Sequence, residues 1–341
     1  MIGVHYPASA KSASGNPELY GSPLYHQIIS KESLWQAWES ARKAKRNRKA
    51  VFEFDTNSGY EIDQLHQELV SGNYQPKPPR TFLIHEPKQR VIQAPDIRDS
   101  VVQHAIYAAI YPIFDRTFIH DSYGCRVDKG THKASDKLQE YMRQCSGDSY
   151  YLQLDIQKFY YSIDTGILRD RISRKINCPV LIDLIMMFSS DKVGLNIGYL
   201  LSQLKGLVYL DRMDHYIKRV LKIKRYVRYV DDFILVGLNR DDAFYLKGHI
   251  EEWLKNNLNL SLSKWHISKI KSGVNFVGFR TWQEGRLIRK RSLNNFGKAL
   301  KKEQLESLQS LLTHAKHTGT KKHFIARLSD EKPLLLERLK L

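Results

Sequence analysis

Cysteine is scarce in this chain of 341 residues, which contains only Cys125, Cys145 and Cys178. They are odd in number and widely spaced, and no C-x-x-C pair occurs, so neither a disulfide framework nor a zinc module is predicted. Long apolar runs are also missing. The segment VLIDLIMMF is broken by Asp183 and falls far short of the ~20 residues that a membrane span needs. With no signal peptide evident, these absences favour a reducing cytoplasm and no membrane.

Acidic residues are few beside the basic ones. The chain has 54 Lys and Arg against 36 Asp and Glu, a formal net charge of +18. A basic surplus of this size indicates a polyanionic partner, and without membrane features that partner is nucleic acid. The 42% share of hydrophobic residues excludes a disordered chain, and the length allows two or three lobes.

The distribution of apolar residues predicts an α+β protein in which helices cover one sheet. Residues 1–22 have no hydrophobic period and are expected to form a tail. The alternation in TFLIHEPKQRVIQAP predicts a hairpin with its turn near Pro87. Helical spacing is found in the following ranges: 100–111, 133–145, 165–176, 181–189, 199–221 and 242–257.

The segment RYVRYVDDFILVG, residues 225–237, sets Asp231 and Asp232 side by side in an apolar, β-prone run. Burying two adjacent ionised carboxylates costs several kcal/mol unless something compensates them. A third carboxylate, Asp155, ends the alternating strand YLQLD. Brought together, the three could hold two divalent cations ~4 Å apart, which makes the repulsion tolerable. The alternative is that the aspartate pair only forms a polar hairpin turn.

Several segments occur together in a fixed order: LQLDIQKFYYSID, GLNIGYLLSQLKGLVYLDRMDHYI, RYVRYVDDFILVG and GVNFVGF. They resemble motifs A, B, C and E of reverse transcriptases of the bacterial retroelement type. The resemblance implies a right-hand polymerase fold of fingers, palm and thumb, with an antiparallel palm sheet backed by helices. We expect a flexible arm in residues 1–30, the N-terminal region and fingers in 31–148, the palm in 149–280 and a helical thumb in 281–341.

The same resemblance implies an RNA-directed DNA polymerase that uses two Mg²⁺ ions, with Mn²⁺ as a possible substitute. Asp155, Asp231 and the carbonyl of Ile156 would bind the ions, and Asp232 would support the second carboxylate or the primer end. Tyr160 falls where the family keeps an aromatic gate against the ribose 2′-hydroxyl. A core aromatic is the alternative for that residue.

Basic residues outside the carboxylate motifs match the family's contacts to nucleotide and nucleic acid. Lys88 and Arg90 correspond to finger residues that grip the incoming triphosphate, and Lys264 could protonate the pyrophosphate leaving group. Each could instead be an ordinary surface charge. Weaker candidates for nucleic-acid contact are Arg126 and three residues of the basic thumb: Arg289, Lys290 and Arg291.

Motif B departs from the retroviral and group II intron pattern. The chain has Ile197-Gly198 followed by Ser202-Gln203, which looks like the reverse transcriptases of diversity-generating retroelements. Ile197, Gly198 and Gln203 would then lie beside the nascent base pair, and loss of a polar contact there would weaken discrimination opposite adenine. The resemblance implies three kinds of partner: deoxynucleotides, a template RNA with its RNA/cDNA duplex, and a small basic accessory variability determinant expected to be a pentameric ring. Ile197 as a simple packing residue is the alternative.

Two other functions remain open from the sequence: a bacterial antiphage-defence or retron reverse transcriptase, and a catalytically silent RNA-binding scaffold. The intact Asp155, Asp231 and Asp232 argue against the scaffold. His314 and His317 could be called metal ligands, but without acidic or cysteine partners nearby a helix-surface position is expected. No endonuclease or ribonuclease H carboxylate set is found, and the protein is expected to be cytoplasmic and encoded by a bacterium or phage.

Overall fold

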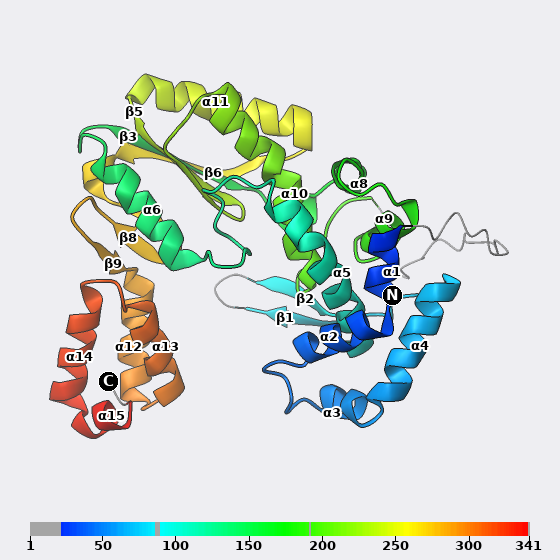
Figure 1. Cartoon of the computed structure of the whole chain (residues 1–341). Helices are drawn as coiled ribbons and strands as arrows, with labels where there is room; N and C mark the ends of the chain where they lie inside the picture. The colour runs from blue at the N-terminus through cyan, green and yellow to red at the C-terminus, as the bar shows by residue number, and fades with distance from the viewer. Residues whose placement is uncertain (1–21, 86–88, 191, 340–341) are drawn as a thin grey trace. The chain divides into compact units, whose positions relative to one another are not determined.

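The computed structural model describes residues 22–85, 89–190 and 192–339. The chain divides into two compact units, Met1–Arg116 with Thr165–Lys205, and Thr117–Asp164 with Gly206–Leu341 (Figure 1). Within the described ranges, no helix is both long and apolar enough to cross a bilayer. All three cysteines are free, as the sequence predicts.

The first unit is mainly helical and is organised around helix α5 (Ile97–Asp115). Its side chains Val101, Val102, Ile106 and Ile110 are all buried, because helices contact α5 on more than one face. The contacting helices are α1 (Pro23–Ile29), α2 (Lys31–Ala41), α3 (Lys49–Thr56) and α4 (Ser58–Ser71). Helix α8 (Thr165–Ser173) packs on α9 (Pro179–Met186) in the same unit.

Helix α1 lies inside the segment 1–30 that was expected to be a flexible arm. Its Tyr25 and Ile28 are buried, and the Tyr25 hydroxyl donates a hydrogen bond to the carbonyl of Leu69. The expected boundary at residue 30 is therefore wrong for α1, whereas residues 1–21 lie outside the described ranges. A seven-residue helix has too few turns to give a clear period, and its stability comes from tertiary packing.

The predicted hairpin of the first unit is present. Strands β1 (Arg80–Ile84) and β2 (Arg90–Ala94) pair antiparallel, with Phe82 opposite Ile92 and Leu83 opposite Val91. The predicted turn near Pro87 and the candidate Lys88 lie outside the described residues.

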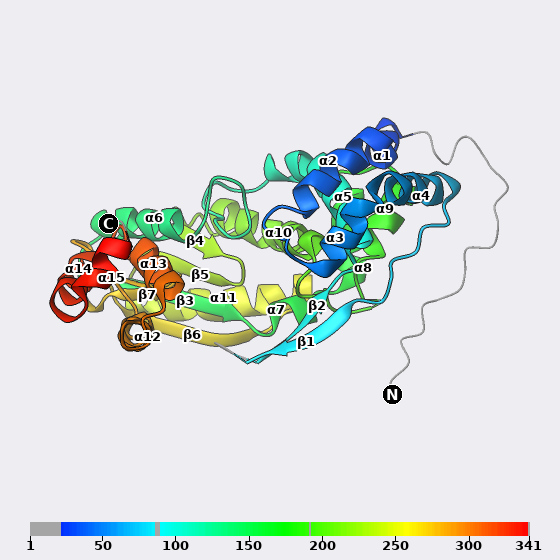
Figure 2. The same cartoon turned by 90° about the horizontal axis from the view of Figure 1, so that it is seen from below.

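The second unit contains the expected antiparallel sheet. Its four strands lie in the order β4-β5-β3-β6, as Figure 2 shows. They are β3 (Tyr150–Ile156), β4 (Tyr226–Tyr229), β5 (Asp232–Leu238) and β6 (Leu262–Lys269). The two predicted acidic strands, β3 and β5, are thus direct neighbours in the sheet.

Two of the helices that pack on this sheet contact different pairs of strands. Helix α11 (Arg240–Leu258) packs on β3 and β6, and α6 (Thr131–Arg143) packs on β4 and β5 (Figure 1). Because side chains alternate along a strand, Tyr151, Gln153 and Asp155 share one face of β3. Tyr151 joins the core under α6, with Ile234 of β5. Gln153 and Asp155, further along the strand, are only partly buried.

A smaller sheet and a helical cluster complete the second unit. The sheet has the order β7-β8-β9, with β7 (Val274–Phe276), β8 (Phe279–Thr281) and β9 (Arg286–Ile288). The predicted basic helices follow: α12 (Lys290–Lys301), α13 (Leu305–His314), α14 (Thr320–Glu331) and α15 (Pro333–Arg338). The rings of Phe296 and Phe324 stack at 3.7 Å in their core. The three-residue strand β9 was not expected, since it is too short to show an alternation.

Four further elements connect the strands and helices already described. Helix α10 (Leu200–His215) continues into a π-helix, η2 (Tyr216–Val220), and matches the long predicted helical pattern 199–221. Helix α7 (Phe159–Ser162) follows β3, and a 3-10 turn, η3 (Ile270–Ser272), follows β6.

Of His314 and His317, one differs from the helix-surface position that the sequence favoured. The ring of His314 stacks on Phe279 with centroids 4.5 Å apart, and His132 of α6 lies 5.3 Å from His317. His314 is partly buried and His317 is exposed, so the helix-surface expectation is wrong for His314. Among the described residues, no group of three or more His, Cys, Asp or Glu side chains could hold a metal ion.

A fully buried ion pair lies at the centre of the second unit. Arg228 of β4 and Asp214 of α10 are both 0% exposed. The Arg228 Nε donates to Asp214 Oδ1 at 2.7 Å, its Nη2 donates to Oδ2, and the hydroxyl of Tyr226 donates to Oδ1 at 2.6 Å. The pair is thus saturated with hydrogen bonds, which is the condition under which a buried charge pair is tolerated.

We predict that Asp214→Asn lowers the free energy of unfolding by about 3–5 kcal/mol, because it leaves the Arg228 guanidinium buried without a counter-charge. Urea denaturation monitored by circular dichroism measures this loss. The control is Asp148→Asn, which breaks exposed pairs with Lys269 and Lys271 and should leave the free energy of unfolding nearly unchanged. Equal small losses in both variants would contradict the prediction.

Candidate active site

The turn that carries the aspartate pair has an unfavourable backbone conformation. Between β4 and β5, Val230 has φ +58°, a region that β-branched residues rarely occupy and that costs of order 1–3 kcal/mol. Arg228 offsets part of this cost, because its Nη1 donates to the carbonyl of Val230 at 2.9 Å. The buried ion pair therefore fixes the residue immediately before Asp231.

A second segment supports the turn from the side. Ser122 forms a parallel bridge with Arg228, and the backbone N–H of Tyr123 donates to the Arg228 carbonyl at 2.9 Å. The next residue, Gly124, passes so close to the turn that a Cβ there would lie 2.5 Å from Cγ2 and 2.7 Å from N of Val230. Only glycine allows this approach.

The register of the sheet brings the carboxylates together. Asp155 of β3 lies opposite Asp232 of β5, and the backbone N–H of Ile156 donates to the carbonyl of Asp231 at 3.3 Å. On the other side of β3, Asp155 lies opposite Lys264 of β6. The carboxylate of Asp155 also accepts a short hydrogen bond from the hydroxyl of Ser263.

Crowding of negative charge is visible at Asp232. Burial is the main cause that raises its pKa to about 7, and the charges of Asp155 and Asp231 raise it further, while a hydrogen bond from Gln153 lowers it. Carboxylate and carbonyl oxygens are the ligands that Mg²⁺ prefers. The donor chemistry therefore fits a divalent cation, although the described carboxylates are not gathered into a closed set of three ligands.

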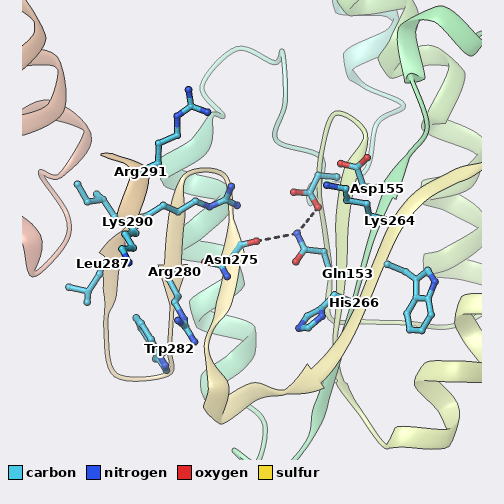
Figure 3. A pocket seen from close by; sticks show the side chains of 14 residues that line it. Gln153, Asp155, Lys264, His266, Asn275, Arg280, Trp282, Leu287, Lys290 and Arg291 are labelled. Carbon is cyan, nitrogen blue, oxygen red and sulfur yellow. Dashed lines mark hydrogen bonds between the residues drawn. The ribbon is translucent and has the colours of Figure 1, made fainter. Parts of the chain in front are cut away.

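A cavity of about 920 Å³ opens beside these carboxylates, within the second unit. Figure 3 shows acidic and polar side chains of the large sheet on one side and basic side chains of β8 and α12 on the other. The cavity brings together six of the residues predicted from the sequence: Asp155, Asp232, Lys264, Arg289, Lys290 and Arg291. It also contains Gln153, His266, Asn275, Arg280 and Trp282, which were not predicted.

Tyr160 lies on helix α7, just after β3. Its ring is 5.2 Å from that of Phe159, and Gly206 of α10 packs so closely that an added Cβ would lie 3.3 Å from the Tyr160 ring. Burial is the largest cause of its raised pKa, and the negative charge of Asp231 contributes. Tyr160 is therefore packed near the turn that carries Asp231, as a gate or a core aromatic would be.

The weaker candidate Arg126 has an internal role. Its Nη1 donates to the carbonyls of Ile119 and Ser122, at 2.7 and 3.2 Å, and its guanidinium lies over the ring of Phe118. These contacts shape the segment that supports the turn between β4 and β5. Contact of Arg126 with nucleic acid stays a prediction.

The remaining candidates belong to the first unit. Arg90 begins strand β2, and Gln203 is exposed on α10. The carbonyl of Ile197 accepts a hydrogen bond from the Gln93 N–H at 2.8 Å. Gly198 has φ +116°, and a Cβ there would lie 2.6 Å from the Gln93 carbonyl oxygen. The Ile-Gly pair of motif B is therefore docked directly on β2.

Sequence reasoning missed the residues that hold the carboxylates in place, among them Gln153, Ser263, Asp214 and Gly124. Gln153 had a detectable signal, since it precedes Asp155 by two positions and must share its face of β3. Ser263 and Asp214 become partners only through the strand register and helix packing, which local patterns do not reveal.

A family assignment follows from comparison with known proteins. The sequence profile described as reverse transcriptase (RNA-dependent DNA polymerase) matches residues 75–281, more than half of the chain. The chain belongs to the reverse transcriptase family. This match contains both acidic strands and the motif B loop, and it confirms the expected enzyme class, RNA-directed DNA polymerase.

Individual relatives are distant. Protein YkfC of Escherichia coli (strain K12) is 26% identical over 286 residues, which cover 68% of this chain and 72% of YkfC. The group II intron-encoded protein LtrA of Lactococcus lactis subsp. cremoris is 22% identical and matches 84% of this chain, which spans only 62% of LtrA. Among solved structures, apo telomerase from Candida tropicalis has a TM-score of 0.48 at 11% identity, over 86% of this chain and 71% of that one.

We predict that Gly124→Ala lowers the rate of deoxynucleotide incorporation on a primed RNA template by about tenfold or more. The added Cβ must push the backbone of Val230, and a shift of ~1 Å at a reacting group can cost a hundredfold. The matched control is Gly248→Ala in α11, where a Cβ meets nothing within 4 Å. Single-nucleotide extension assays compare the two, and equal rates would contradict the proposed support of the turn.

Proposed function

We propose that this chain is the polymerase of a diversity-generating retroelement, which copies a structured RNA into cDNA with errors concentrated opposite adenine. The arrangement of Asp155, Asp231 and Asp232 beside a cavity with a basic wall supports the polymerisation. Ile197, where the group II intron and retroviral pattern has Gln, supports the mutagenic role. Its backbone is docked on β2 through the Gln93 N–H, so its side chain is presented from a fixed position.

In this proposal Asp155, Asp231 and the Ile156 carbonyl hold two Mg²⁺ ions, and Asp232 supports them or the primer end. Such ions, when bound, help to activate a 3′-hydroxyl and neutralise charge on a triphosphate. Among the chain's own residues, Ser263 orients the Asp155 carboxylate through a hydrogen bond from its hydroxyl. Lys264, opposite Asp155 in register, would donate a proton to the pyrophosphate leaving group.

Tyr160 would act as the gate that excludes ribonucleotides. Its ring is backed by Phe159 and by the close approach of Gly206, so it has little room to retreat from a 2′-hydroxyl. Lys88 and Arg90 would grip the incoming triphosphate, Arg90 being suited to paired contacts with phosphate oxygens.

As a right-hand polymerase, the chain would have its fingers in 31–148, its palm in 149–280 and its thumb in 281–341. Arg289, Lys290 and Arg291 would contact the phosphates of the RNA/cDNA duplex, a grip independent of sequence and sensitive to salt. The partners would be the template RNA and a basic accessory ring protein, in a bacterial or phage-infected cytoplasm.

We expect the purified chain, with the RNA encoded beside its gene, Mg²⁺ and all four deoxynucleotides, to synthesise cDNA whose errors cluster at template adenines. Asp231→Asn should lower synthesis by at least about a thousandfold while RNA binding is retained, and Asp148→Asn should not. Sequencing of the product separates the candidates. Faithful cDNA would favour a defence or retron enzyme, and RNA binding without any cDNA would favour a silent scaffold.

We predict that Ile197→Gln lowers the error frequency opposite adenine by about threefold to tenfold. A restored hydrogen bond beside the nascent pair has a net value of about 0.5–1.5 kcal/mol. Deep sequencing of cDNA measures the change, with Ile197→Leu as the control that stays aliphatic and keeps the error pattern. An unchanged error spectrum in Ile197→Gln would assign Ile197 to packing.

A further inference from the structure

Gln153 lines the cavity beside the carboxylates. Its side-chain Nε2 donates to Asp232 Oδ1 at 2.9 Å and to the backbone carbonyl of Asn275 at 3.1 Å. Figure 3 shows both hydrogen bonds, with the amide between the carboxylate and β7. One amide therefore links the large sheet to the small one.

Strand geometry makes this link specific to position 153. Gln153 lies opposite Ile234 of β5, and Asp232 is two residues along the same strand, so the two side chains are diagonal neighbours on one face. The flanking Leu152 and Leu154 point to the opposite face and are fully buried. No shift of register by one residue can supply another donor here, because it would exchange the faces.

The chemistry at this point requires a donor. Both acceptors are oxygen atoms, and a side-chain amide NH₂ carries two hydrogens, one for each. Asp155 lies opposite Asp232 in the register and Asp231 precedes it in the chain. Both carboxylates repel Asp232, and the charge of Arg289 acts against them. With one oxygen of Asp232 held by Gln153, rotation of the carboxylate is restricted, which fixes the direction of its other oxygen.

We propose that Gln153 is a positioning residue for polymerisation, which holds Asp232 in one orientation and couples it to strand β7. This inference rests on the proposed function, in which Asp232 supports the ions or the primer end. Beyond Asn275, the small sheet contributes Arg280 and Trp282 to the cavity wall. Gln153 thus joins the small sheet, which would face the primer strand, to Asp232, which would support the primer end.

The test is Gln153→Met, which keeps a side chain of similar length and removes the donor. We expect kcat for deoxynucleotide incorporation on a primed RNA template to fall by about tenfold to a hundredfold. The KM for the deoxynucleotide and the Kd for the primed template, measured by fluorescence anisotropy, should change less than about twofold. Gln153→Glu, which also removes the donor and adds a carboxylate, should lose at least as much and serves if the methionine variant does not fold.

The matched control is Gln139→Met on α6. The Gln139 amide also donates two hydrogen bonds, to the backbone carbonyls of Trp282 and Gln283, and Gln139 lies on a helix, outside the strands that carry the carboxylates. This variant should keep the wild-type kcat and have a similar melting temperature to Gln153→Met.

Wild-type kcat in both Gln153 variants would overturn the inference, as would parallel losses of kcat, template affinity and melting temperature, which indicate a purely structural role. Asp231→Asn distinguishes this failure from that of the proposed function. If the wild type makes cDNA and Asp231→Asn does not, a normal Gln153→Met refutes the role of Gln153 alone. If the wild type makes no cDNA, both proposals fail.

Discussion

Because Arg228 is fully buried, its guanidinium must find all its acceptors inside the protein, and it finds them on Asp214 and on the carbonyl of Val230. The first acceptor ties β4 to helix α10, and the second fixes a turn whose valine has a positive φ. A buried pair of this kind adds little net stability. Its consequence is geometric, since the turn it holds determines where Asp231 and Asp232 point.

One face of the large sheet is apolar at one end of β3 and polar at the other. The face can therefore contribute both to a hydrophobic core and to a group of carboxylates. Under α6, the face is apolar and Tyr151 and Ile234 are buried. Two and four residues further along β3, Gln153 and Asp155 reach the cavity, where Asp232 meets them from β5. The apolar part anchors the strands, and the polar part lines the cavity. Burial is the main cause that raises the pKa of Asp232 in this part, and the charges of Asp155 and Asp231 add to it.

Much of this arrangement could be predicted from the sequence, and the limits have physical causes. The acidic strands, the hairpin and the long helices follow from hydrophobic period, and the grouping of Asp155 with Asp232 follows from motif order. Asp214 could not be found this way, because an aspartate in a helical pattern is ordinarily read as a solvated residue. The partial burial of His314 could not be predicted either, because its partner Phe279 comes from a strand more than thirty residues away.

In the motif B loop, residues 197 and 198 are held against β2 by their backbone. The carbonyl of Ile197 is bound by the Gln93 N–H, and Gly198 lies too close to the Gln93 carbonyl for any Cβ. Both contacts involve backbone atoms of residue 197 or its neighbour, so they persist whichever side chain occupies position 197. A change from Ile to Gln at this half-buried position is therefore expected to leave the backbone contacts of the loop in place. Ile197 is therefore the residue at which the proposed mutagenic role is most directly tested, because a change in fidelity there can be separated from a change in the backbone of the loop.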